Sequence, residues 1–368
     1  MLGATIVSRF LGQLGVAVTS RLRESPIPVV GLTRRALLLG GTLGAIGTPI
    51  MAVVTAASGQ VSAKLAVIGA LGIVPNIGWQ TISGVLLGQG RLRLWNVIQL
   101  LSPVLALAAL LVLVAWLDTG VSGALGGWAL ANALTALFAL AAARDLWLPA
   151  RFPWMLDGTG RTILRLAIVM GAVQVVALVS YRAELFVLGT ESGNAAVGIY
   201  SIALQAVESM WLVPAAIATA VTAPVVAAAD DAGAAALIAR SSVKALSLAV
   251  LIAAGVAVIA PFLIPAAFGN EFKDAVVPLE LLLPGVVLYA PVTVLVVYLS
   301  VRRGEPWWSL VVAVASLAVT LGGALLLIPG HGADGAAVAS SIGYAAGGAI
   351  AWGLFVWLRR RGYTRSRQ

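Results

Sequence analysis

The sequence predicts an all-α polytopic membrane protein built from two pseudo-symmetric helical bundles, five helices and then six, around a central cavity. Three observations predict this class: the composition, the recurrence of apolar segments of membrane-spanning length, and the sorting of charge between them. Hydrophobic residues make up 61% of the chain and charged residues 10%, and the mean hydropathy is +1.03. Soluble domains carry about a quarter charged residues, so this chain could not cover a soluble globule with polar groups.

Eleven apolar segments have the length that a membrane-spanning helix needs, which is about 20 residues. Arg9 lies in the middle of the first segment, and the chain start lacks the basic region and cleavage site of a signal peptide. The predicted spans are 2–20, 36–57, 65–87, 94–117, 121–143, 163–188, 196–222, 243–267, 276–300, 307–328 and 334–358.

Basic residues fall in every second loop between the predicted spans. That side holds most of the 23 Lys and Arg residues, whereas the intervening loops hold mainly acidic and amide residues and His331. Cytoplasmic loops are enriched in Lys and Arg, so the basic side is predicted to be cytoplasmic. The sequence therefore predicts a multi-pass protein of the bacterial cytoplasmic membrane, with Met1 outside and the C-terminus inside.

Two sets of landmarks recur in the two halves at similar spacing, which indicates an internal repeat. Thr119–Ala124 matches His331–Ala336 at the start of a helix, and Gln89–Arg91 matches Arg302–Gly304 at a basic turn. Six spans are expected in each half, so truncation or start-site assignment would explain the absent first helix. The predicted organisation is an N-terminal bundle at 1–143, a cytoplasmic linker at 144–162, a C-terminal bundle at 163–358 and a basic cytoplasmic tail at 359–368.

Several classes of chemistry are disfavoured by residue counts. The chain has no cysteine and one histidine, so thiolate chemistry, histidine zinc sites and Ser-His-Asp triads are not expected. None of its three lysines follows a glycine as a Walker A loop requires. No cofactor, metal or catalytic residue is therefore predicted, and the net charge of +9 is attributed to membrane topology rather than to nucleic-acid binding.

Polar side chains inside predicted spans are the candidate functional residues, because a charge at the bilayer centre costs at least ~2.5 kcal/mol. Glu208 lies deepest, and Gln205 shares its helix face. The candidate substrate-cavity residues are Arg9, Gln13, Asn76, Gln80, Arg182 and Gln205, and the candidate ion-coupling residues are Glu184, Glu208 and Glu280.

Structural alternatives stand beside these roles. Arg182 can pair with a nearby acid or extend to the outer interface, Asn76 and Gln80 can bridge neighbouring helices, and Glu280 can be solvated near a helix end. Three small-xxx-small pairs predict close helix packing rather than phosphate binding. These pairs are Gly40/Gly44, Gly84/Gly88 and Gly343/Gly347.

Several short motifs resemble those of bacterial polysaccharide exporters. Tyr181–Gly189 followed by Val197–Ser201 is similar to their seventh-to-eighth helix passage, with Glu184 where Asp is commoner. Phe268–Phe272 and Ile328–Ala337 are similar to their outer-loop signatures. These flippases belong to the multidrug, oligosaccharidyl-lipid and polysaccharide superfamily. The resemblance covers nearly the whole chain and implies helices two to twelve of a twelve-helix fold, arranged as two bundles in a V around a central cavity.

The resemblance implies a flippase that moves polyprenyl-diphosphate-linked oligosaccharide across the cytoplasmic membrane by alternating access, for polysaccharides such as lipopolysaccharide O-antigen. Its predicted partners are the lipid bilayer, the lipid-linked glycan and other glycan-assembly membrane proteins, with no nucleic acid. Three alternatives remain: a multidrug antiporter of the same superfamily, a degenerate non-transporting homologue, and a membrane-embedded glycan polymerase or glycosyltransferase. The last normally needs a larger loop or soluble domain than the roughly 20-residue connections that this sequence offers.

Overall fold

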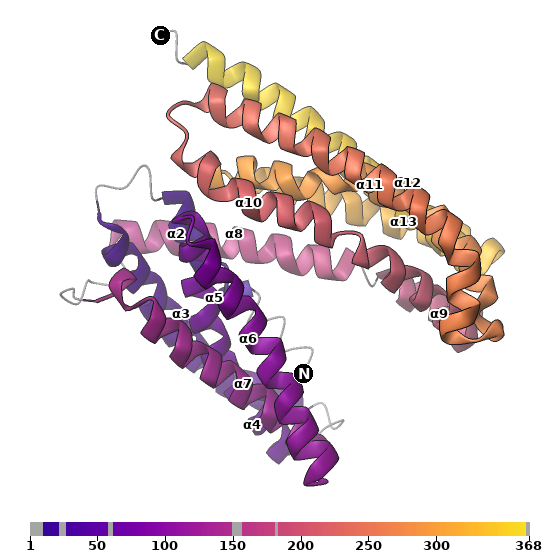
Figure 1. Cartoon of the computed structure of the whole chain (residues 1–368), viewed down its shortest axis with the longest axis horizontal. Coiled ribbons are helices and arrows are strands. Elements are labelled where there is room, and N and C mark those ends of the chain that lie inside the picture. The colour runs from indigo at the N-terminus through magenta and orange to yellow at the C-terminus, as the bar shows by residue number, and fades with distance from the viewer. Residues whose placement is uncertain (1–9, 22–26, 58–61, 149–156, 181–182, 366–368) are drawn as a thin grey trace. The chain divides into compact units, whose positions relative to one another are not determined.

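The computed structural model describes residues 10–21, 27–57, 62–148, 157–180 and 183–365, and every regular element in these ranges is a helix. The chain divides into two compact units, Met1–Val175 and Val176–Gln368. Figure 1 shows the helices of both units. The division falls inside the helix that follows the predicted linker at 144–162.

The N-terminal unit contains long helices joined by short turns. Its α6 continues into one turn of π-helix, and α7 is followed by one turn of 3₁₀-helix. The elements are α2 (Leu14–Arg21), α3 (Val29–Ala57), α4 (Ala63–Leu71), α5 (Ile73–Gly88), α6 (Leu92–Leu110), η1 (Leu111–Trp116), α7 (Gly120–Ala142), η2 (Arg144–Leu146) and the first part of α8 (Gly158–Ser180).

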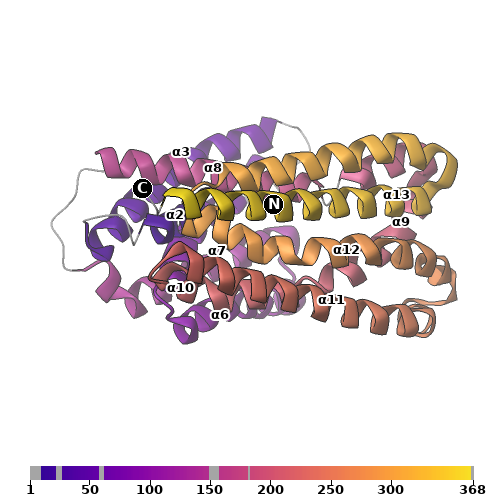
Figure 2. The same cartoon turned by 90° about the horizontal axis from the view of Figure 1, so that it is seen from above.

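The C-terminal unit is a second bundle in which α11, α12 and α13 run side by side (Figures 1 and 2). Two of its helices turn back within their bounds: α9 at Gly193, with φ 78°, and α13 at Gly332, with φ 52°. The elements are α9 (Ala183–Ser209), α10 (Leu212–Ala227), α11 (Asp231–Phe268), η3 (Asn270–Ala275), α12 (Val276–Val296), η4 (Val297–Arg302) and α13 (Trp307–Arg365).

Eight helical stretches among the described residues are long and apolar enough to cross a membrane. Two of them, Gly158–Ala227 and Trp307–Arg360, each correspond to two predicted spans, because the chain turns back at Gly193 and at Gly332. Eight plus two accounts for the last ten of the eleven predicted spans. Of the first predicted span, 2–20, residues 1–9 lie outside the described part of the chain.

Helix ends differ from the sequence-based expectation in the middle of the chain. The predicted span 163–188 is α8 plus the start of α9, and the return turn comes later, at Gly193. The predicted span 196–222 is interrupted between Ser209 and Leu212, where α9 gives way to α10. Average hydropathy identifies the apolar stretch but gives no signal for a backbone break inside it.

The basic and helix-entry turns of the two halves share the same backbone geometry. Gly90 and Gly304, in the two basic turns, have φ of 70° and 62°. Gly120 and Gly332, in the two helix-entry turns, have φ of 58° and 52°. Only glycine adopts such positive φ readily, so the repeated landmarks mark equivalent turns in the two units.

Small residues bring helices into close contact within each unit, as the glycine pairs predicted. A Cβ atom added to Gly84 of α5 would lie 2.5 Å from the carbonyl carbon of Gly15 in the neighbouring helix α2. A Cβ atom added to Gly285 of α12 would lie 2.4 Å from the Cα atom of Ser341 in α13. Both crossings therefore depend on the missing side chain.

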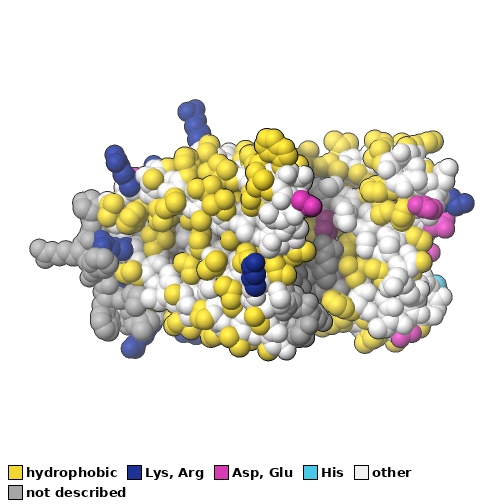
Figure 3. All heavy atoms as spheres, turned by 90° about the horizontal axis from the view of Figure 1, so that it is seen from below, with side chains coloured by type: hydrophobic (Ala, Val, Ile, Leu, Met, Phe, Trp, Pro, Cys, Tyr) yellow, Lys and Arg dark blue, Asp and Glu magenta, His cyan; other side chains and the backbone are white. Residues whose placement is uncertain are grey.

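Large apolar side chains face outward along the spans. Figure 3 shows hydrophobic side chains spread over much of the visible surface. Leu326 of α13 is 82% exposed and Phe262 of α11 is 77% exposed. Exposed apolar surface on this scale is unusual for a soluble monomer and fits a protein whose helices contact lipid.

Candidate functional site

A buried carboxyl group forms the centre of the C-terminal unit. The side chains of Glu184, Tyr200 and Ser340 are all fully buried. The Tyr200 hydroxyl lies 3.3 Å from Glu184 Oε1 and 3.2 Å from Ser340 Oγ. The turn at Gly193 brings Glu184 and Tyr200 together, because it folds the two segments of α9 against each other.

The tyrosine that contacts this carboxyl group lies in an apolar core. Tyr200 belongs to the core of the unit with Leu188, Leu204 and Leu279, which are all buried. A carboxyl group in such a core is costly to keep charged.

A helix interruption lies further along the same chain segment. α9 ends at Ser209 and α10 begins at Leu212. Pro214 has no N–H group, so it cannot donate to the carbonyl of Met210 as a helical residue would. Half-buried Glu208 lies just before the interruption. Interrupted helices with free carbonyls are where membrane transporters commonly place binding sites.

Three aromatic rings pack next to this interruption. Trp211 and Tyr344 lie 5.7 Å apart between ring centroids, and Tyr289 and Tyr344 lie 5.5 Å apart. Tyr344 is buried, whereas Trp211 and Tyr289 are half-buried. The rings come from the start of α10, from α12 and from α13, so they fix the interruption against the rest of the unit.

The N-terminal unit holds a different polar cluster, made of amides. Asn76 Nδ2 donates to Asn132 Oδ1 at 2.6 Å, and the Trp79 indole donates to the same oxygen at 2.9 Å. Gln80 Nε2 donates to Asn76 Oδ1. Asn132 lies on α7 and the other three residues lie on α5, so the cluster joins two helices. This bridging is the structural alternative expected for Asn76 and Gln80, and it leaves Gln80 half-buried.

The remaining predicted site residues are distributed as follows. Arg9 and Arg182 lie outside the described residues. Gln13 is half-buried just before α2. Gln205 is exposed on α9, and Glu280 is exposed near the start of α12. The structure thus brings Glu184 into a buried cluster in one unit and Asn76 with Gln80 into another, while Gln205 and Glu280 stand on the surface of their unit.

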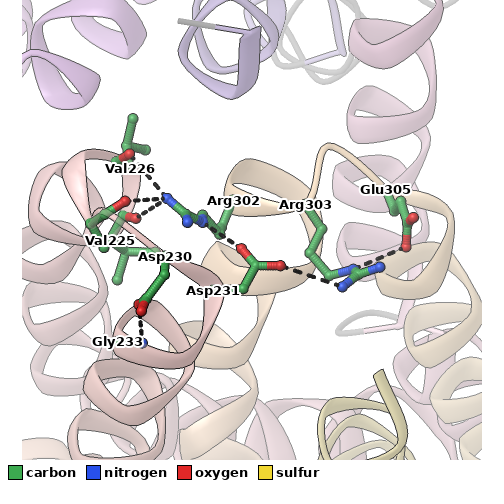
Figure 4. A network of polar contacts seen from close by, with 9 residues as sticks. Val225, Val226, Asp230, Asp231, Gly233, Arg302, Arg303 and Glu305 are labelled. Carbon is green, nitrogen blue, oxygen red and sulfur yellow. Dashed lines mark hydrogen bonds and ion pairs between the residues drawn. The ribbon is translucent and has the colours of Figure 1, made fainter. Parts of the chain in front are cut away.

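A network of charged groups lies at the basic turn of the C-terminal unit (Figure 4). The side chain of Arg302 is 2% exposed. Its Nη1 donates to the carbonyls of Val225, Val226 and Ala228 at 3.0–3.3 Å, and its Nε donates to Asp231 Oδ1 at 3.0 Å. Arg302 thereby satisfies the last carbonyls of α10, which helix geometry leaves without donors.

The same network extends along the turn that precedes α13. Arg303 Nη1 lies 3.9 Å from Asp231, and Arg303 Nε lies 3.3 Å from Glu305. The indole of Trp308 donates to Glu305 at 3.2 Å. Asp231 therefore joins two neighbouring arginines, and the turn between η4 and α13 is tied to the turn between α10 and α11.

Two ion pairs of the N-terminal unit differ in their exposure, and the Arg91 pair is the more exposed of the two. Arg35 Nε lies 3.0 Å from Asp157 Oδ2, and Arg91 pairs with Asp145 at 2.7 Å, with side chains 37% and 59% exposed. Asp157 also accepts from the backbone N–H of Gly160 and so caps α8. The Arg35 guanidinium holds the pKa of Asp157 below the usual range of an aspartate.

Sequence reasoning missed four residues of these clusters: Tyr200, Ser340, Asn132 and Arg302. Asn132 could have been found, because it is an amide inside an apolar segment. Tyr200 and Ser340 are 140 residues apart in the chain, and a hydroxyl in a membrane helix carries little signal. Arg302 was interpreted only as a topology marker.

Comparison with known proteins shows which class of membrane protein has this fold. An outward-facing multidrug resistance MATE family transporter of the MOP superfamily has a TM-score of 0.82 at 18% identity, covering 98% of this chain and 85% of that chain. A MATE protein in the bent conformation has a TM-score of 0.84 at 18% identity, covering 100% and 87%. A MOP superfamily transporter from Pyrococcus furiosus, described as having a binding pocket of reversed polarity, has a TM-score of 0.80 at 18% identity, covering 98% and 85%.

This chain is therefore a multi-pass membrane protein with the fold of MOP superfamily transporters. Residues 91–277 match the family described as polysaccharide biosynthesis protein, and the chain belongs to that family. A search of curated proteins found no match. Family and fold are those of transporters rather than of enzymes.

Proposed function

We propose that this protein is a flippase that translocates a polyprenyl-diphosphate-linked oligosaccharide across the bacterial cytoplasmic membrane by alternating access, with its C-terminus on the cytoplasmic side. The observation that carries the proposal is membership of the polysaccharide biosynthesis family over residues 91–277 in a chain that has a transporter fold. Such a chain acts on the lipid-linked precursor that polysaccharide assembly requires, beside other membrane proteins of that assembly.

The physics of the substrate explains why such a fold is needed. A diphosphate-sugar head cannot cross about 30 Å of hydrocarbon unaided. Polar side chains within the spans can replace the water that the head loses, while the polyprenyl tail stays in lipid. The amides on α5 and α7 and the carboxyl groups on α9 supply polar groups of two kinds at membrane depth. Rocking of two bundles would then change which side of the membrane the head group reaches.

Ion coupling is assigned to the carboxyl groups of α9. Glu208 is half-buried next to the helix interruption, and Glu184 is fully buried against Tyr200. Proton uptake at either residue would remove a charge from the span and favour one conformation. Glu184→Gln and Glu208→Gln should each flatten the pH dependence of transport.

The decisive experiment measures leaflet exchange. The purified protein is reconstituted into vesicles with a radiolabelled polyprenyl-diphosphate oligosaccharide, and accessibility of the label to an external enzyme is followed with time. The expected result is transfer that empty vesicles lack and that Glu184→Gln slows at least tenfold. Transfer equal to that of empty vesicles would refute the proposal.

A second candidate function is multidrug antiport, which is favoured by the similarity of the fold to that of a multidrug resistance MATE family transporter. It predicts ion-driven movement of cationic dyes by the same vesicles. Dye movement without lipid transfer would select this function. Movement of neither would select the non-transporting homologue.

A further inference from the structure

The amide cluster of the N-terminal unit has a defined direction. Asn132 Nδ2 donates to the backbone carbonyl of Trp128 at 2.8 Å, and a carbonyl can only accept. Asn132 Oδ1 must therefore face α5, where it accepts from Asn76 and from the indole of Trp79. An indole can only donate, so two independent partners fix the same orientation of the Asn132 amide.

This direction passes along the chain of amides to Gln80. Because Asn76 donates through Nδ2, its Oδ1 is the acceptor, and it receives the Nε2 group of Gln80. Exposure increases along the same path: Asn132 is 1% exposed, Asn76 is 9% exposed and Gln80 is half-buried. Gln80 thus turns its nitrogen inward, and its carbonyl oxygen and second N–H group form no hydrogen bond with the described residues.

We infer that Gln80 is the sugar-recognising residue of the flippase, and that Asn132 and Asn76 are the positioning residues that orient it; this inference rests on the proposed function. A fixed carbonyl acceptor beside an N–H donor matches two neighbouring sugar hydroxyls, since each hydroxyl can donate and accept. A diphosphate offers acceptors only, so it could use the N–H group of Gln80 but not its carbonyl oxygen. A cation would find no charge to pair with in this cluster.

The amide chain explains why recognition can be selective. A free glutamine loses rotamer freedom on binding, whereas one already held by a neighbour loses less. The Asn132 and Asn76 bonds hold the end of Gln80 before the sugar arrives. Loss of a neutral hydrogen bond of this kind corresponds to about a three- to tenfold change in affinity.

The experiment compares two probes on the purified full chain: undecaprenyl diphosphate, and the same lipid bearing one N-acetylhexosamine. We expect the wild type to bind the sugar-bearing lipid about three- to tenfold more tightly than the sugar-free lipid. Gln80→Ala should abolish this difference. Gln99→Ala, at an exposed glutamine of α6, is the matched control and should keep the difference.

Two further variants separate positioning from direct contact. Asn132→Leu leaves Gln80 in place but removes its anchor, so it should also lose the sugar-dependent difference. Trp79→Phe removes only the indole donor, and the Trp128 carbonyl still orients Asn132. This variant should therefore keep the tighter binding of the sugar-bearing lipid. A melting curve reports whether Asn132→Leu folds, and the half-buried Gln80→Ala variant tests the inference if it does not.

The outcomes distinguish this inference from the proposed function. If the wild type binds neither lipid, the flippase proposal fails. If it binds both lipids equally, or if Gln80→Ala keeps the preference for the sugar-bearing lipid, sugar recognition by Gln80 is wrong while the flippase proposal stands. If Gln80→Ala loses the preference but Asn132→Leu keeps it, the positioning role of the amide chain is wrong.

Discussion

The two units share turn geometry but bury different chemistry. Both have positive-φ glycines at their basic turns, Gly90 and Gly304, and both have close helix crossings at glycine. Yet the N-terminal unit buries neutral amides around Asn132, whereas the C-terminal unit buries the carboxyl group of Glu184. Backbone geometry has therefore been kept between the halves while the polar core has diverged. Such divergence suits a transporter in which one half recognises the substrate and the other responds to ions.

The basic turns show a second contrast. Arg91 in the N-terminal unit forms an exposed ion pair, whereas Arg302 in the C-terminal unit is buried and bonded to three carbonyls and a carboxylate. Both residues occupy matching turns of the repeat. Matching positions in the repeat therefore do not give two arginines the same surroundings, because the neighbouring helices determine whether the side chain is buried.

The largest effect on stability is expected when the buried polar group of one unit is replaced by the kind that the other unit buries. Asn132→Asp should destabilise the protein by about 3 kcal/mol or more, because a buried charge would face the carbonyl of Trp128. Glu184→Gln should cost less than Asn132→Asp, because an amide oxygen can still accept from Tyr200 and no charge is added to the core. Thermal melting in detergent measures both. Equal losses would mean that the two cores do not differ as the comparison requires.

The next effect concerns the arginines of the basic turns. Arg302→Ala should cost about 2–3 kcal/mol, because buried carbonyls of α10 lose their donor. Arg91→Ala should cost less than about 1 kcal/mol, because both partners of its ion pair are solvated. Chemical unfolding of the two variants in parallel gives the comparison. A loss for Arg91→Ala as large as that for Arg302→Ala would contradict it.

A smaller effect tests the feature that the units share. Gly84→Ala and Gly285→Ala should each destabilise by about 1–2 kcal/mol, because the new methyl group meets backbone atoms of the next helix at about 2.5 Å.

Gly41→Ala and Gly255→Ala are the controls, one in each unit, because no atom lies within 4 Å of an added Cβ. They should be neutral or stabilise by up to about 1 kcal/mol through helix propensity. Melting temperatures of the four variants decide the matter. A control that destabilises as much as its partner would show that packing is not the cause.

Much of the fold could be predicted because apolar length and charge sorting are local signals. The predicted span 334–358 and the turn before it correspond to the second segment of α13 after Gly332. The candidate site was harder to predict from the sequence. Glu184 was recognised as an intramembrane carboxyl group, but its partner Ser340 comes from a distant helix and no local pattern connects them. Pro214 signals a kink in this segment, but hydropathy alone does not place the break between Ser209 and Leu212.

The smallest expected effect is the acid sensitivity that Asp157 gives to the N-terminal unit. Its pKa is lowered chiefly by the hydrogen bond from Arg35, so the folded state holds the charged form more strongly than the unfolded state does. The stabilisation is therefore fully present above the ordinary aspartate pKa of ~3.9 and is lost as pH falls through the lowered folded-state pKa.

Asp157→Asn should remove this part of the acid dependence while keeping the N-cap bond to Gly160, since asparagine also caps helices. Asp157→Ala should lose the cap as well and melt lower at every pH, by the equivalent of about 1 kcal/mol. Melting curves recorded between neutral pH and pH 3 measure both variants. If Asp157→Asn keeps the full acid slope of the wild type, the Arg35 pair does not produce it.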